Sequence, residues 1–139
     1  GGTGFIGQYV IKILAKTGAK INIIHKNPHE HKALTLCGSP GQIVYIQYSN
    51  RDDFLAKIIK NSTHVINLVG ILYETTNQKF IDIHENLPEK IARYCKQYEI
   101  KKFIHISALG VDKISTTQYA VTKFQGEKKV IREFPNAII

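Results

Sequence analysis

The stretch that decides the fold is "GGTGFIG", residues 1–7, in which glycines recur at the spacing of a phosphate-binding loop. Gly2, Gly4 and Gly7 give the pattern GxGxxG, and the use of Gly1 in place of Gly2 gives GxxGxxG. In either register one glycine allows a tight turn, one lets the backbone approach a pyrophosphate, and one brings the next helix close to a sheet. The amides at the start of that helix then face the phosphates. We therefore interpret the stretch as a dinucleotide-binding loop rather than a flexible glycine-rich end.

The rest of the chain alternates apolar strands with amphipathic helices. Strands are expected at 20–25, 42–48, 63–72 and 101–110, and helices at 5–18, 29–36 (weak), 54–60, 79–99 and 116–134. This alternation predicts an α/β fold of Rossmann type, a doubly wound parallel sheet covered by helices on both faces. The loop has no strand before it and "NAII" (136–139) begins another strand, so we expect one incomplete domain over 1–139. We expect it to lack the first strand and the C-terminal portion.

Two of the helices carry local detail. In the range 5–18 a single apolar stripe is expected, made of Ile6, Val10, Ile13 and Leu14, and Gly18 ends the helix. In the range 79–99 Pro88 is best tolerated in a first turn, so the helix proper is expected to begin near Leu87.

Composition excludes several classes of protein. The hydrophobic content of 43% is that of a globular domain with a core. The net charge of +8 comes mainly from scattered lysines, which favours a solvated surface over an anionic partner, and no nucleic acid is expected. Cys37 and Cys95 lack metal-site or CxxC spacing and are interpreted as reduced thiols of an intracellular protein. No apolar run reaches the roughly 18 residues of a membrane span.

The end of the second expected strand informs the choice of cofactor. An acidic residue about 20 positions after the loop usually binds the ribose 2′-hydroxyl of NAD. Here His25, Lys26 and Asn27 occupy that place, and the first acid is Glu30. A cation suits a 2′-phosphate, so NADP(H) is favoured and NAD(H) is the alternative. The competing interpretation is that Lys26 is an ordinary surface lysine.

The segment "YAVTK" places Tyr119 and Lys123 four residues apart, on one helical face. In a reductase, a lysine in this place lowers the pKa of the tyrosine, so that the phenol passes a proton to or from a substrate oxygen. The same spacing occurs at Tyr98 and Lys102, but that pair straddles a helix end and a strand start. We prefer the first pair, and Ser107, after the fifth strand counted with the missing one, is the candidate third member. The alternative for Ser107 is a strand-end serine that bonds the backbone.

The histidines have structural interpretations. His29 and His31 flank Glu30 but do not share a helical face, so solvated side chains are expected. His105 alternates with apolar neighbours in a strand and is expected to be a packed core or interface residue. No metal site is predicted.

Several segments together resemble a known family. The loop, "NLVG" (67–70), "FIHISALG" (103–110) and "YAVTK" are similar to the extended and atypical short-chain dehydrogenases/reductases, in their NAD-dependent epimerase/dehydratase branch. Within this branch, "GQIVYIQYSNRDD" (41–53) and "ENLPEKIARY" (85–94) resemble the NADPH-binding accessory subunits of respiratory complex I and their bacterial relatives. The similarity runs over nearly the whole chain.

The resemblance implies a Rossmann domain that binds NADP(H). It implies cofactor contacts at Gly1, Thr3, Gly4, Phe5, Ile6, Gly7, His25, Lys26, Asn50, Asn67, Leu68, Val69, Tyr119 and Lys123. Lys123 would bind the nicotinamide ribose, and Asn67 to Val69 would line the nicotinamide side. Lys26 would take the place of the family's basic residue after the second strand.

The sequence departs from active epimerases at three places. The family's catalytic Ser or Thr falls on Ala108, one position after Ser107. The helix Asn that supports the lysine through water falls near His84, and the adenine-contacting Asp is replaced around Ser49, next to Asn50. The first two departures count against catalysis, and the third weakens only the adenine contact.

Two functions follow as hypotheses. In the first, the protein is an accessory or assembly subunit of complex I that holds NADP(H) without turnover and contacts other complex I subunits. In the second, it is an NAD(P)-dependent oxidoreductase or epimerase acting on a sugar nucleotide or small carbonyl. Here Tyr119 would be the acid/base, Lys123 its activator and Ser107 the carbonyl-binding group. The expected location is the bacterial cytoplasm, including the inner membrane, or the matrix side of the mitochondrial inner membrane.

Overall fold

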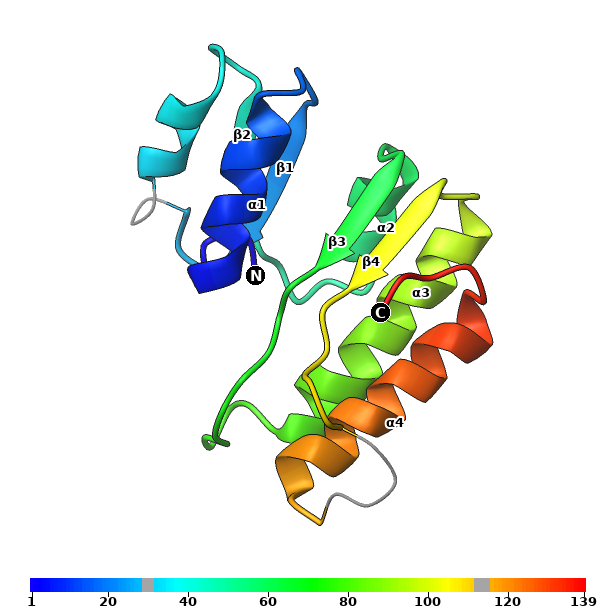
Figure 1. Cartoon of the computed structure of the whole chain (residues 1–139). Helices are drawn as coiled ribbons and strands as arrows, with labels where there is room; N and C mark the ends of the chain where they lie inside the picture. Colours follow the sequence, from blue (N-terminus) through cyan, green and yellow to red (C-terminus); the bar gives the residue numbers. More distant parts are fainter. Residues whose placement is uncertain (29–31, 112–115) are drawn as a thin grey trace. The chain divides into compact units, whose positions relative to one another are not determined.

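A computed structural model of the chain describes residues 1–28, 32–111 and 116–139 (Figure 1). The chain divides into two compact units, Gly1–Phe54 (unit 1) and Leu55–Ile139 (unit 2). Each unit contains one pair of parallel strands, which confirms the α/β class with parallel pairing. In the described residues the strands form two separate pairs, whereas the sequence predicted one sheet.

Unit 1 contains helix α1 (Phe5–Ala15), strand β1 (Ile21–His25), the 3₁₀ helix η2 (Lys32–Cys37) and strand β2 (Ile43–Gln47). β1 and β2 pair in parallel from Ile21 opposite Ile43 to His25 opposite Gln47. The core consists of Ile11, Ala15, Ile21, Ile23, Leu34 and Ile43. Both strands were predicted. Of the helix predicted at 29–36, residues 29–31 lie outside the described residues, and the remainder is 3₁₀ rather than α.

Only part of the predicted stripe is buried in α1, where Leu14 packs against the core of unit 1 and Val10 is half-buried. Ile6 and Ile13 are 51% and 65% exposed, and the helix instead buries Gly7, Ile11 and Ala15. These three positions are also spaced by four residues, so the periodicity fits them equally well. Two of them are small, which allows the helix to approach the strands closely, and a count of large apolar side chains overlooks them.

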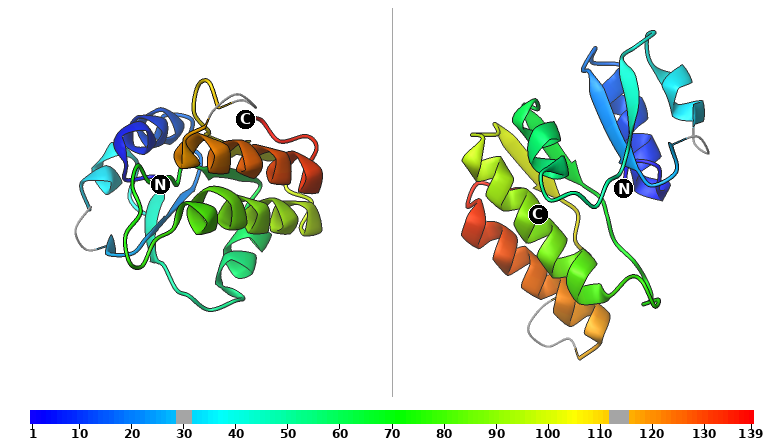
Figure 2. Two further views of the ribbon diagram at one scale, coloured as in Figure 1. Left: turned by 90° about the horizontal axis from the view of Figure 1, so that it is seen from below. Right: turned by 180° about the vertical axis from the view of Figure 1, so that it is seen from behind.

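Unit 2 contains α2 (Phe54–Lys60), which begins at the last residue of unit 1, followed by strand β3 (His64–Asn67) and the π-helix η3 (Ile81–Asn86). After these come α3 (Leu87–Gln97), β4 (Lys102–His105) and α4 (Gln118–Glu133). β3 and β4 are parallel, and α3 and α4 lie side by side (Figures 1 and 2). The core is Ile59, Ile91, Ala92, Cys95, Ile100, Phe103 and Val130.

The start predicted for α3 and the helix predicted at 116–134 are both found in unit 2. α3 begins at Leu87 with Pro88 in its first turn, as predicted. α4 is capped by Thr117, whose hydroxyl accepts a hydrogen bond from the Ala120 amide at 3.3 Å. An ion-pair cluster joins α3 to α4, because Glu89 lies 3.4 Å from Lys129 and also pairs with Arg132.

Both strands of unit 2 are shorter than predicted. β3 ends at Asn67 because the Asn67 side chain accepts a hydrogen bond from the Val69 amide at 3.1 Å, which turns the chain out of the strand. An isolated parallel bridge between Ile104 and Ile138 agrees with the strand expected at "NAII". Cys37 and Cys95 are free thiols. The described residues contain no helix long and apolar enough to cross a membrane.

Candidate functional site

The glycine loop of unit 1 has the tight packing that its spacing predicts. The Gly4 amide donates to the Gly1 carbonyl at 3.1 Å, and α1 starts at the next residue. A Cβ on Gly7 would lie 2.3 Å from the Gly1 oxygen, and a Cβ on Gly2 would lie 3.0 Å from the Ile11 side chain. Gly7, common to both registers, therefore has to be glycine, and Gly2 lets the loop pack against the helix.

The first turn of α1 starts at a residue that cannot cap it. The N-cap is Gly4, so within the described residues no N-cap side chain accepts from the first-turn amides. Of the predicted contacts in this turn, Phe5 and Ile6 are exposed and Thr3 is half-buried. α1 starts at the same end of unit 1 as the carboxyl end of β1 (Figure 1). This end carries the other predicted contacts of the unit.

His25, Lys26 and Asn50 lie at or just after the carboxyl ends of β1 and β2. The His25 Nδ1 atom accepts a hydrogen bond from the Asn27 amide at 3.0 Å, and the His25 carbonyl accepts one from Tyr48 at 2.8 Å. Lys26 and Asn50 are exposed. The strand pairing thus brings the predicted 2′-phosphate and adenine positions to one edge of unit 1.

In unit 2, Tyr119 lies in the first turn of α4 and is half-buried. Its ring meets His84 edge-on at 5.2 Å between centroids and Phe80 edge-on at 5.9 Å. The rings of Phe80 and His84 are themselves stacked at 5.1 Å. Aromatic pairs of this geometry orient a side chain as well as bury it, so η3 and its leading residue fix the tyrosine ring.

Lys123 lies one turn after Tyr119 and is only 4% exposed. Its ammonium donates to the Ile106 carbonyl at 3.2 Å, and a Cβ on Gly70 would lie 3.4 Å from Nζ. Burial lowers the pKa of Lys123, and the charge of Glu127 offsets part of this effect. The lysine is therefore a desolvated cation held beside the segments that follow β3 and β4.

The side chain of Asn67 is used within the protein. Its amide nitrogen donates to His105 Nδ1 at 3.0 Å, and its oxygen accepts from the Val69 amide. Asn67 and His105 are both buried, which confirms the core interpretation of the histidine. Asn67 thus shapes the turn through half-buried Leu68 and Val69.

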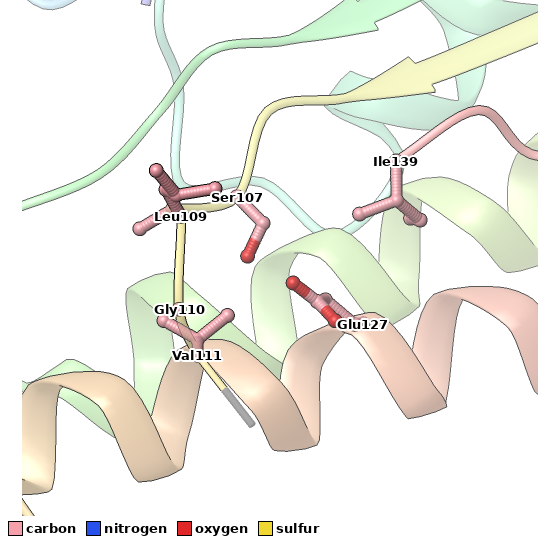
Figure 3. Close-up of a pocket in the computed structure, with 7 residues that line it drawn as sticks. Ser107, Leu109, Gly110, Val111, Glu127 and Ile139 are labelled. Atoms are coloured by element: carbon pink, nitrogen blue, oxygen red, sulfur yellow. The ribbon is translucent and has the colours of Figure 1, made fainter. Parts of the chain in front are cut away.

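Ser107, the candidate carbonyl-binding residue, lies just after β4. Its hydroxyl is buried, has no hydrogen-bond partner among the described residues, and points toward the Glu127 carboxylate (Figure 3). It lines an open pocket of about 430 Å³. The other lining residues are Ala108, Leu109, Gly110, Val111, Glu127 and Ile139.

The structure brings together the predicted site residues of each unit. Unit 1 gathers the loop, His25, Lys26 and Asn50, and unit 2 gathers the segment after β3 with Tyr119 and Lys123. Sequence reasoning missed the contacts of His84 with Thr122 and with the backbone at Ile71. A glycine inside α4, at position 126, was the available signal for close helix packing there. No metal-like cluster occurs in the described residues, and His29 and His31 lie outside them.

Comparison with known proteins identifies the family. The model of the NAD dependent epimerase/dehydratase family matches residues 1–132. The chain belongs to this family. Two solved structures of similar fold are UDP-glucuronic acid 4-epimerase from Bacillus cereus in complex with NAD (TM-score 0.76, 22% identity) and WbmG from Bordetella bronchiseptica in complex with NAD (TM-score 0.74, 14% identity). They cover 96% and 94% of this chain, and the chain covers 50% and 47% of theirs. This likeness confirms the Rossmann-type fold.

Within the epimerase/dehydratase family the chain is similar to subunits of a respiratory enzyme. It is 36% identical over 141 residues to the rat "NADH dehydrogenase [ubiquinone] 1 alpha subcomplex subunit 9, mitochondrial". It is 31% identical over 140 residues to the "NADH-ubiquinone oxidoreductase 40 kDa subunit, mitochondrial" of Neurospora crassa. Both matches cover the whole chain but only 37% of the relative. The chain thus spans about a third of the length of these relatives.

Proposed function

We propose that the chain is the nucleotide-binding part of an accessory subunit of NADH:ubiquinone oxidoreductase (complex I). It holds NADP(H) as a structural group and does not turn it over. The observation that carries this proposal is the similarity along the whole chain to subunits of that enzyme. The partners are then other complex I subunits, on the matrix side of the mitochondrial inner membrane in a eukaryote.

Each unit, taken by itself, holds groups that such a nucleotide needs. In unit 1 the loop and the uncapped start of α1 bind the pyrophosphate, while exposed Lys26 binds a 2′-phosphate. In unit 2 Lys123 binds the nicotinamide ribose, and residues 67–69 line the nicotinamide. NADP(H) is preferred to NAD(H) because a cation occupies the position where NAD enzymes use a carboxylate. The bound group would supply only binding energy here.

The side chains around Tyr119 favour binding over turnover. The Ser107 hydroxyl points toward Glu127, and Ala108 follows it (Figure 3). His84, near the place of the family's supporting Asn, has both ring nitrogens engaged by protein groups. These features count against a substrate-carbonyl site that uses the Ser107 hydroxyl.

One observation favours a second function, that of an NAD(P)-dependent oxidoreductase or epimerase. Tyr119 and Lys123 lie one turn apart on α4, and Lys123 is a buried cation with a lowered pKa. This is the arrangement an acid/base tyrosine uses. If a turnover with NADP(H) is found, Tyr119→Phe should abolish it, and an unchanged rate would exclude this mechanism.

The experiment for the accessory function uses complex I purified in mild detergent from cells that express the protein. We expect the protein to co-purify with the complex, and acid release followed by mass spectrometry to give one NADP(H) per copy. Deletion of the gene should reduce the amount of assembled complex I. Normal assembly and activity after deletion would contradict the proposal.

A further inference from the structure

The π-helix η3 places one buried histidine between the two parts of unit 2 that carry predicted contacts. π-helical turns are rare and are frequently found at functional sites. A Cβ on Gly126 would lie 1.8 Å from the His84 carbonyl oxygen, so α4 approaches the η3 backbone at a distance that only a glycine permits. His84 is 1% exposed. Its ring is therefore fixed by backbone packing as well as by its own contacts.

The hydrogen bonds of His84 define its protonation. The Ile71 amide donates to Nε2 at 3.2 Å, so Nε2 carries no proton. Nδ1 then carries the proton and donates to the Thr122 hydroxyl at 3.1 Å, and this hydroxyl donates to the Gln118 carbonyl at 2.8 Å. The Ile71 amide, His84 Nδ1 and the Thr122 hydroxyl each have an acceptor only when the imidazole of His84 is neutral.

The ring also touches the groups assigned to the nucleotide. Its edge-on contact orients Tyr119, and Phe80 stacks on the imidazole. The bond to Ile71 fixes the residue next to Gly70, whose added Cβ would lie 4.0 Å from His84 Nε2 and 3.4 Å from Lys123 Nζ. A single side chain thus links the segment after β3 to both residues of the Tyr–Lys pair.

We propose that His84 is a positioning residue, which holds the Gly70–Ile71 backbone against Tyr119 and Lys123 and so shapes the nicotinamide-ribose half of the nucleotide site. This inference rests on the proposed nucleotide-binding function. It assigns His84 no contact with the pyrophosphate or adenine. Loss of its hydrogen bonds should therefore weaken the affinity for a ligand that carries nicotinamide and leave a ligand without nicotinamide unaffected.

The test compares two probes on three variants of the native protein. NADPH contains the nicotinamide and its ribose, whereas 2′-phospho-ADP lacks both. His84→Phe keeps a stacked ring but loses both hydrogen bonds, whereas His84→Gln retains an acceptor and a donor. His64→Phe is the control, because His64 is exposed at the start of β3. The dissociation constant is measured by calorimetry for each pair.

We expect His84→Phe to weaken NADPH binding about tenfold, the effect of one or two hydrogen bonds lost at a buried site, and to weaken 2′-phospho-ADP binding less than twofold. His84→Gln should restore NADPH affinity to within about threefold of wild type, and His64→Phe should match wild type. Equal weakening of both probes by His84→Phe, or of neither, would overturn the positioning role. Wild-type protein that binds neither probe would instead overturn the nucleotide-binding function itself.

A fourth variant tests the proposal if His84→Phe does not fold. Thr122→Val removes the acceptor for His84 Nδ1 and keeps the side-chain shape. We expect it to weaken NADPH binding about threefold to tenfold and to leave 2′-phospho-ADP binding unchanged. Unchanged NADPH affinity, or equal weakening of both probes, would count against the proposal. The ¹⁵N resonances of His84 give an independent readout, because the structure requires a proton on Nδ1 and none on Nε2.

Discussion

The ammonium of Lys123 lies 3.2 Å from the Ile106 carbonyl oxygen, so a cation from α4 is buried against the backbone that follows β4. Its pKa is lowered because burial removes water from the charge. This carbonyl is its one hydrogen-bond acceptor within the described residues. A buried ammonium with one acceptor costs stability in the free protein, and a ribose hydroxyl would provide a further acceptor.

We therefore predict that Lys123→Met has opposite effects on stability and binding. The free energy of unfolding should stay equal or rise by about 1 kcal/mol, because an apolar chain of similar length replaces a desolvated charge. The affinity for NADPH should fall by at least about tenfold, because a charge-assisted hydrogen bond is lost. Urea unfolding and calorimetry on the same preparation measure both quantities. A variant that is less stable yet binds normally would refute this account of Lys123.

Gly126→Ala tests the close contact between α4 and η3. Alanine normally stabilises a helix interior by up to about 1 kcal/mol relative to glycine. Here the new Cβ would lie 1.8 Å from the His84 carbonyl oxygen, so we expect a loss of about 2 kcal/mol or more. Gln125→Ala, at the exposed neighbouring position, should change the unfolding free energy by less than about 0.5 kcal/mol. A stabilised Gly126→Ala variant would show that the two helices do not approach this closely.

How far the sequence predicts unit 2 depends on the range of the interactions involved. Pro88 and Thr117 act on the nearest turn, so the starts of α3 and α4 follow from local chemistry. The π-helix does not, because its backbone contacts Gly126 of α4, a helix that is distant in the sequence. The sequence likewise identified Tyr119 and Lys123 by their spacing, but the partners of His84 come from residues 13 and 38 positions away.

The early end of β3 illustrates the same limit. An apolar run at 63–72 favours a buried strand, but the Asn67 side chain caps the Val69 amide and ends it. Whether an asparagine ends a strand depends on whether its side chain is buried, and a short stretch of sequence does not show this. In unit 1 the choice between the Ile6–Ile13 stripe and the Gly7–Ala15 face depended on the closeness of the strands, a tertiary property.

The buried histidines predict a specific loss of stability in mild acid. Burial is the main cause that lowers the pKa of His84 and of His105 to about 4, and the charge of Lys123 adds to it. In the unfolded chain both groups titrate near 6.5, so between pH 6.5 and 4 the unfolded state binds more protons. The contribution of these two histidines to the free energy of unfolding should therefore be complete above pH 6.5, and it should decrease as the pH falls toward 4.

This loss should reach up to about 2 kcal/mol for each histidine between pH 7 and pH 5, above the range in which carboxylates usually titrate. Urea unfolding at a series of pH values measures it. The double variant His84→Gln, His105→Gln should show a much shallower dependence. A wild-type profile that is flat from pH 7 to pH 5 would show that the two imidazoles are not held neutral.

Lys26→Glu tests the choice between the two cofactors. A carboxylate at the end of β1 repels a 2′-phosphate and can accept from a 2′-hydroxyl. We expect the ratio of NADPH to NADH affinity to fall by about tenfold or more. Lys20→Glu makes the same change of net charge at an exposed position before β1 and should leave the ratio within about twofold. Equal ratios in the two variants would assign the effect to net charge.

The most direct test of the central claim is a calorimetric titration of the native protein, stripped of bound nucleotide, with NADPH and with NADH. The account predicts one binding site per chain and a tighter dissociation constant for NADPH. Absence of measurable binding for both nucleotides, by protein whose folding is verified in the same sample, would contradict it.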